Sequence, residues 1–139
     1  MALHNDTGVI GEEAAAAFLR EKGYKILENN WHAGHLEVDI IAQKKDWVAF
    51  VEVKTRTSTY GDKQPEEYVD KDKQAKIARA ANIYIGKHGC QLKARFDIIA
   101  VLLNAETQKA ENINHIEEAF YPPTRTIGTY KPQKKRRTL

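Results

Sequence analysis

Three acidic residues and a lysine lie close together in this 139-residue chain, within two segments that are otherwise rich in apolar residues. The first segment carries Glu37 and Asp39, and the second carries Glu52 and Lys54. Mg²⁺ prefers carboxylate oxygens as ligands, and a neighbouring lysine can orient a water molecule or offset charge on a phosphate. These residue types therefore favour metal-dependent hydrolysis of a phosphodiester, with Mg²⁺ or Mn²⁺ as the cation.

A β-hairpin is predicted to position these side chains. Residues 36–43 and 47–56 are typical of two strands, and the connection between them is short enough for an antiparallel pair. Alternation puts Leu36, Val38, Ile40 and Ala42 on one face of the first strand, and Val48, Phe50, Glu52 and Lys54 on one face of the second. A turn with an even number of residues would place Glu37 and Asp39 on the side of Glu52, whereas an odd turn or a bulge would separate them.

Charged residues inside an otherwise apolar strand need partners or a function, because burying an unpaired charge is costly. A hard-metal site would meet this need, and so would an ion-pair network in which Lys54 neutralises Glu52 and Asp39. Arg56 ends the second strand on the Glu52 face, where it could clamp a phosphate or complete an ion pair.

The other elements are predicted from periodicity, caps and breakers. A helix is expected over residues 7–22, a strand over 24–28, a second helix from between Glu66 and Asp70 to Ile85, and strands over 96–103 and 113–120. The order αβββαβ, followed by a further strand, predicts an α/β fold with a mixed central sheet flanked by helices. Asp97 is expected to be a structural partner of Arg95 or of a helix end rather than a catalytic group.

The composition is that of a globular protein, with 42% hydrophobic and 29% charged residues. Apolar stretches are too short to span a membrane, and residues 1–23 lack a basic segment followed by an apolar block. The single cysteine, Cys90, cannot form an internal disulfide. We therefore expect a cytoplasmic protein with no membrane partner.

The basic residues are unevenly distributed between a domain, residues 1–120, and a C-terminal tail, residues 121–139. Six of the 22 Lys and Arg residues lie in the tail, which contains no acid, so the domain has 16 basic and 19 acidic residues. Such a tail is either simply solvated and flexible or contacts phosphates. This asymmetry leaves open a function as a non-catalytic nucleic-acid-binding adaptor.

Several motifs carry a resemblance to a known family. Asp39, twelve intervening residues and then Glu52-Val53-Lys54 resemble the PD-(D/E)xK nuclease signature. Further motifs over residues 7–102 are similar to those of the YraN-like family of endonucleases, which is related to archaeal Holliday-junction resolvases: Thr7-Gly8, Gly11-Glu12, Gly23-Tyr24, Asn30, Glu37-Val38-Asp39, Phe50 to Arg56, Gly61, Lys73 and Arg95-Phe96-Asp97. Leu36 stands where the family usually has glycine.

The resemblance implies a restriction-endonuclease-like αβββαβ core and assigns roles to individual residues. Asp39 and Glu52 would bind the metal, Lys54 would be the catalytic lysine, and Glu12 would reach the site from the first helix as an outer or second-metal ligand. Glu37 would be an accessory residue. Lys73 would contact a phosphate, although a lone lysine on a helix is more often solvated.

The function implied is that of a Mg²⁺- or Mn²⁺-dependent endonuclease whose partner is DNA, including branched, Holliday-junction-like DNA. A homodimer would place two such clefts side by side, as cutters of symmetric junctions require.

Overall fold

The computed structural model describes residues 7–58, 68–88 and 92–121 of the chain. In these ranges the elements are α1 (Thr7–Glu21), β1 (Lys25–Ala33), β2 (Leu36–Lys44), β3 (Trp47–Ser58), α2 (Lys71–His88), β4 (Lys93–Asn104) and β5 (Ala110–Ile116). The predicted order αβββαβ, followed by one further strand, is confirmed. The predicted basic tail falls almost wholly outside the described residues.

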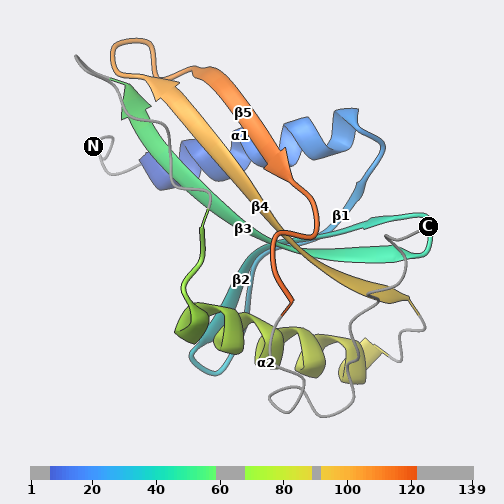
Figure 1. Ribbon diagram of the computed structural model, residues 1–139. Helices are drawn as coiled ribbons and strands as arrows, with labels where there is room; N and C mark the ends of the chain where they lie inside the picture. Colours follow the sequence, from blue (N-terminus) through green and yellow to red (C-terminus); the bar gives the residue numbers. More distant parts are fainter. Residues whose placement is uncertain (1–6, 59–67, 89–91, 122–139) are drawn as a thin grey trace.

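The strands form one mixed sheet in the order β1-β2-β3-β4-β5. The β3–β4 pair is parallel and the other neighbouring pairs are antiparallel. The two helices cover opposite faces of the sheet (Figure 1). On the α2 side the core contains Phe50, Phe96 and Tyr84, and on the α1 side it contains Leu19 and Val51. No helix in the described ranges is long and apolar enough to cross a membrane.

Local sequence explains where the elements that matter for the site begin and end. Gly23, with a φ of 96°, follows α1 in the left-handed conformation that glycine adopts readily. Asp70 caps α2, because its Oδ1 accepts a hydrogen bond of 2.9 Å from the amide of Lys73. The turn between β2 and β3 consists of Lys45 and Asp46, since Lys44 pairs with Trp47.

The predicted boundaries of β1, α2 and β5 are wrong. β1 runs on to Ala33 instead of ending at residue 28, because its second half pairs with the start of β2 through Trp31–Val38 and Ala33–Leu36. α2 begins at Lys71 and ends at His88, later than predicted at both ends. β5 covers Ala110–Ile116 rather than 113–120, because it pairs with β4 from Ala110 onward and ends before the two glutamates.

Helix α1 approaches the sheet closely at Gly11, which is buried. A Cβ atom built on Gly11 would overlap the side chain of Thr55 in β3. Glycine at this position therefore lets α1 lie against β3. The next residue of the helix is Glu12, the acidic residue predicted to reach the site.

Gly11→Ala should destabilise the fold by about 1–3 kcal/mol, the usual cost of overpacking a closely packed contact. The matched control is Gly8→Ala in the same helix, because nothing lies within 4 Å of a Cβ at Gly8. Alanine there should leave stability unchanged or raise it slightly, since alanine is the better helix former. Thermal denaturation compares the two; equal midpoints would show that the contact with Thr55 is not close.

Candidate active site

The β2–β3 hairpin brings Asp39 and Glu52 together. The two-residue turn is even, so β2 and β3 stay in regular register as far as Ile40–Val51. At Asp39 the alternation of β2 is broken, and the position of Asp39 follows from its own contact with β3. Main-chain pairing of β2 with β3 ends at Ile40–Val51, one position before Asp39 and Glu52. Beyond that point Asp39 Oδ2 accepts a hydrogen bond of 2.8 Å from the Val53 amide. The Asp39 side chain thus takes the place of a main-chain partner and is held next to the strand that carries Glu52.

The Asp39 carboxyl group holds its proton unusually tightly. Burial and the charge of Glu52, with a smaller contribution from Glu12, raise its pKa from 3.8 to about 7. The hydrogen bond from Val53 and the charge of Lys73 oppose this shift without cancelling it. Burial and the neighbouring carboxylates therefore make a negative charge on Asp39 unfavourable unless a cation compensates for it.

Glu52 has one partner from the opposite side of the site. Lys73 Nζ, from the first turn of α2, lies 3.3 Å from Glu52 Oε2. The Glu52 side chain is only 12% exposed, whereas that of Lys73 is 46% exposed. Burial alone would lower the pKa of Lys73, but the charge and hydrogen bond of Glu52 raise it above its ordinary value. The predicted phosphate contact of Lys73 stays a prediction; in the structure this lysine neutralises Glu52.

The other predicted residues differ in burial and in the contacts that they make. Lys54 is half-buried two positions after Glu52 in β3, and Arg56 is exposed two positions further on. Glu12 acts on Asp39 through its charge from α1. Glu37 instead forms a 2.8 Å ion pair with His32 of β1, and both side chains are more than half exposed.

In residues 7–58, 68–88 and 92–121, no three His, Cys, Asp or Glu side chains form a group that could hold a metal ion. Asp39 and Glu52 are close enough to interact electrostatically, and Glu12 adds a smaller effect on Asp39. Mg²⁺ is commonly bound by one or two carboxylates, and waters and substrate phosphate oxygens complete its coordination. The donor set at this site fits that pattern of binding.

A change of face in the hairpin was not foreseen, and the prediction that Leu36, Val38, Ile40 and Ala42 share one face is wrong. Leu36 and Val38 pack in the core on the α2 side, whereas Ile40 and Ala42 pack on the α1 side. The change occurs at Asp39. Such irregularities re-aim side chains near functional sites.

Strand β1, the neighbour of β2, is distorted at the position opposite Asp39. The register pairs Asn29 with Ile40 and Trp31 with Val38, so Asn30 lies opposite Asp39. Asn30 has a φ of 50°, in the left-handed region that asparagine tolerates better than most residues. The adjacent asparagines in the sequence were the only local signal for this distortion.

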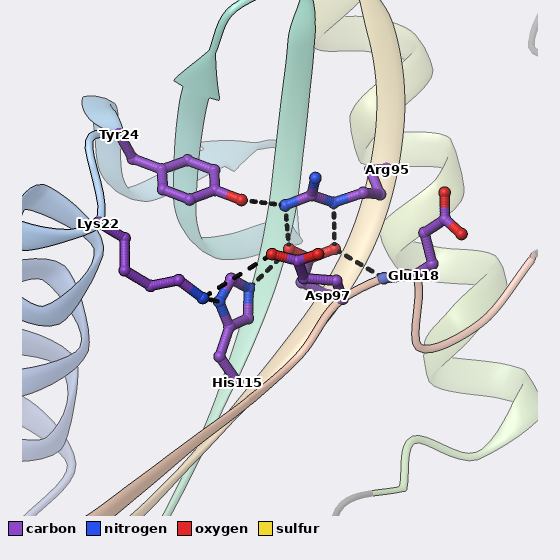
Figure 2. Close-up of polar contacts among 7 residues, drawn as sticks. Lys22, Tyr24, Arg95, Asp97, His115 and Glu118 are labelled. Carbon is purple, nitrogen blue, oxygen red and sulfur yellow. Dashed lines mark hydrogen bonds and ion pairs between the residues drawn. The ribbon is translucent and has the colours of Figure 1, made fainter. Parts of the chain in front are cut away.

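A second polar cluster lies at Asp97, at the start of β4 (Figure 2). Asp97 is fully buried and accepts hydrogen bonds of 2.9 and 2.8 Å from Arg95, 2.8 Å from His115 Nε2 and 3.1 Å from the Glu118 amide. Burial alone would raise the pKa of Asp97, but these bonds from His115 and Arg95 hold it below its ordinary value. The predicted pairing of Asp97 with Arg95 is confirmed.

This cluster connects the junction between α1 and β1 to β4 and β5. Lys22 Nζ lies 2.8 Å from His115 Nδ1, and Tyr24 Oη accepts a hydrogen bond from Arg95 (Figure 2). Since an ammonium group only donates, His115 accepts at Nδ1 and donates from Nε2 to Asp97, which assigns the neutral tautomer. We interpret the cluster as structural, because every carboxylate oxygen of Asp97 is satisfied from within the fold.

Comparison with known proteins adds the family. Residues 11–101, which include Glu12, Asp39, Glu52, Lys54 and Lys73, match the family described as "Uncharacterised protein family UPF0102". A UPF0102 protein of Bacteroides thetaiotaomicron is 46% identical over 127 residues, covering 88% of this chain and 98% of the relative. A UPF0102 protein of Caldanaerobacter subterraneus is 49% identical over 115 residues, covering 81% and 93%. The chain therefore belongs to the UPF0102 family.

Proposed function

We propose that this protein is a metal-dependent endonuclease that hydrolyses phosphodiester bonds of DNA, with branched DNA as the preferred substrate. The observation that carries the proposal is the pairing of Asp39 with Glu52 in a half-buried position, where burial and mutual repulsion raise the pKa of Asp39 to about 7. Such perturbed carboxyl groups are more frequent at functional sites than elsewhere. A bound cation would remove the repulsion.

Each residue of the site has a chemical task in this proposal. Asp39 and Glu52 would hold Mg²⁺ or Mn²⁺, and Glu12 would stabilise the bound cation or its waters from α1. The cation would polarise the scissile phosphate and lower the pKa of water. Lys54 would orient the attacking water or offset charge on the phosphate, and Arg56 would contact a neighbouring phosphate.

The direct test is cleavage of a labelled four-way DNA junction by the full chain, with Mg²⁺ or Mn²⁺ and with EDTA. Cleavage that requires the divalent cation, and is faster on the junction than on a linear duplex of the same sequence, supports the proposal. Divalent-dependent binding without any cleavage would favour the non-catalytic adaptor instead. If the protein neither cleaves nor binds any DNA, both functions are contradicted.

Lys73→Met should strengthen Mn²⁺ binding in the absence of DNA. Lys73 competes with a cation for Glu52, and removing a unit charge near partly exposed groups is worth on the order of 1 kcal/mol, or about fivefold in affinity. The matched control is Lys76→Met, because Lys76 pairs with the exposed Asp72 at 3.6 Å. Titration of free Mn²⁺ by electron paramagnetic resonance measures both. Weaker or unchanged binding in Lys73→Met would show that the pair does not compete with the metal.

Mn²⁺ affinity should depend steeply on pH below neutrality. Because the pKa of Asp39 is raised to about 7, a proton occupies this carboxyl group in mildly acidic solution and must leave when the cation binds. Affinity should rise by up to about tenfold per pH unit from pH 5 to 7 and then level off. The same titration on Asp39→Asn should show weak binding without this rise. A flat profile for the parent protein would contradict the coupling.

A further inference from the structure

A groove lies beside the candidate active site, between α1 and β1. Its volume is about 290 Å³. One side is formed by residues of α1, which are Val9, Glu12, Glu13, Ala16 and Arg20. The other side is formed by Asn29 and Asn30 of β1. None of the roles assigned so far uses Val9, Arg20 or the two asparagines.

The groove is continuous with the candidate site at two residues. Glu12 lines the groove and also acts by its charge on Asp39. Asn30 lines the groove and lies opposite Asp39 in the β1–β2 register. Asn30 is also held at a φ of 50°, and backbone strain of this kind concentrates at functional sites. A ligand in the groove would therefore lie next to the group bound by Asp39.

The lining favours a neutral polar ligand over an anion. Asn29 and Asn30 offer amide donors and acceptors, and Val9, which is 52% exposed, offers apolar surface. The two acids Glu12 and Glu13 outweigh the single base Arg20, so a phosphate inside the groove would be repelled. Asparagine side chains recognise the edges of nucleobases by paired hydrogen bonds.

The size of the groove limits the ligand further. Sites for small ligands usually have volumes of about 300–1,000 Å³, so this groove is at the lower end of that range. It suits one base and not a duplex. Branched and flapped DNA supplies unpaired bases near the branch point, and an unpaired base leaves the stack at little cost.

We propose that this groove between α1 and β1 binds one unpaired base of the DNA, adjacent to the phosphodiester that is cut. Asn29 and Asn30 hydrogen-bond the base edge, and Val9 contacts its face. Arg20, in the last turn of α1, contacts a flanking phosphate that stays outside the groove. This inference rests on the proposed nuclease function and adds to it a specific contact with single-stranded DNA.

The test scans a flapped DNA duplex with one abasic position at a time, and measures both cleavage with Mn²⁺ and binding by fluorescence anisotropy. In the parent protein, loss of one particular base near the cut should weaken binding about tenfold, the effect of one good paired contact. The variants are Asn29→Ala and Asn30→Gly, because glycine keeps the left-handed backbone at residue 30. Both should bind intact DNA more weakly and lose the sensitivity to that abasic position.

Asn112→Ala, at an exposed asparagine of β5, is the matched control and should keep the parent profile. The base-binding proposal is overturned if the DNA is cut but no abasic position has a specific effect, or if the asparagine variants keep the parent profile. Either result leaves the nuclease proposal standing. DNA that is neither bound nor cut would overturn the proposed function, and the groove assignment with it.

Discussion

Glu52→Gln should abolish divalent-dependent DNA cleavage while the protein stays folded. Glutamine keeps the shape of the side chain but removes the charge that would bind the cation. Substitutions of groups that only support a metal ligand typically cost about 10–100-fold in activity, so loss of a direct ligand should exceed about 100-fold. The fold should tolerate the change, since removing the Glu52 charge relieves its repulsion of Asp39.

The controls separate chemistry from folding and from general charge effects. Glu106→Gln changes an exposed glutamate outside the site and should cut like the parent. Lys54→Met should also abolish cleavage, whereas Lys87→Met at the exposed end of α2 should not. Initial rates on the same junction, with circular dichroism to confirm folding, give the comparison. Parent-like cleavage by Glu52→Gln and Lys54→Met would show that these residues are not the catalytic centre.

Asp97→Asn should destabilise the fold severely, by about 3–5 kcal/mol, the usual cost of removing one partner of a buried ion pair. The side chain is fully buried and accepts four hydrogen bonds, two of them from Arg95. An asparagine at this position would leave the Arg95 charge buried without its counter-ion and would turn an amide group towards donors. The matched control is Asp72→Asn, because the Asp72 side chain is 83% exposed and its ion pair with Lys76 contributes little.

Urea denaturation at several pH values tests this account of Asp97. Because the folded-state pKa of Asp97 is lowered, its contribution to stability is fully present above the unfolded-state pKa of about 4 and is lost as the pH falls through the folded-state value. The difference in unfolding free energy between parent and Asp97→Asn should therefore be large at neutral pH and shrink in acid. Equal unfolding midpoints for Asp97→Asn and Asp72→Asn would contradict a structural role for the cluster.

The parts of the fold that sequence predicted well depend on local patterns. The apolar run over residues 48–51 predicted a strand buried on both sides, and the structure confirms it: Val48 and Phe50 pack on the α2 side, and Ala49 and Val51 on the α1 side. The short connection before Trp47 predicted the hairpin. Alternation and turn length depend only on residues close in the sequence, so they can be recognised without the tertiary structure.

Contacts between distant segments could not be predicted. Nothing in the sequence indicates that Lys73, on α2, pairs with Glu52, or that His115 donates to Asp97 eighteen positions earlier. The change of face at Asp39 also escaped prediction. It coincides with the distortion of β1 at Asn30, and alternation within one strand carries no information about the neighbouring strand.

The central claim is that Asp39 and Glu52 together bind a divalent cation, and a crystal of the full chain soaked in Mn²⁺ tests it most directly through anomalous scattering. The account predicts one strong peak within about 2.0–2.3 Å of an oxygen from each carboxylate, with Lys73 displaced from Glu52. A structure at saturating Mn²⁺ in which Glu52 still pairs with Lys73, and no peak lies between Asp39 and Glu52, would contradict it.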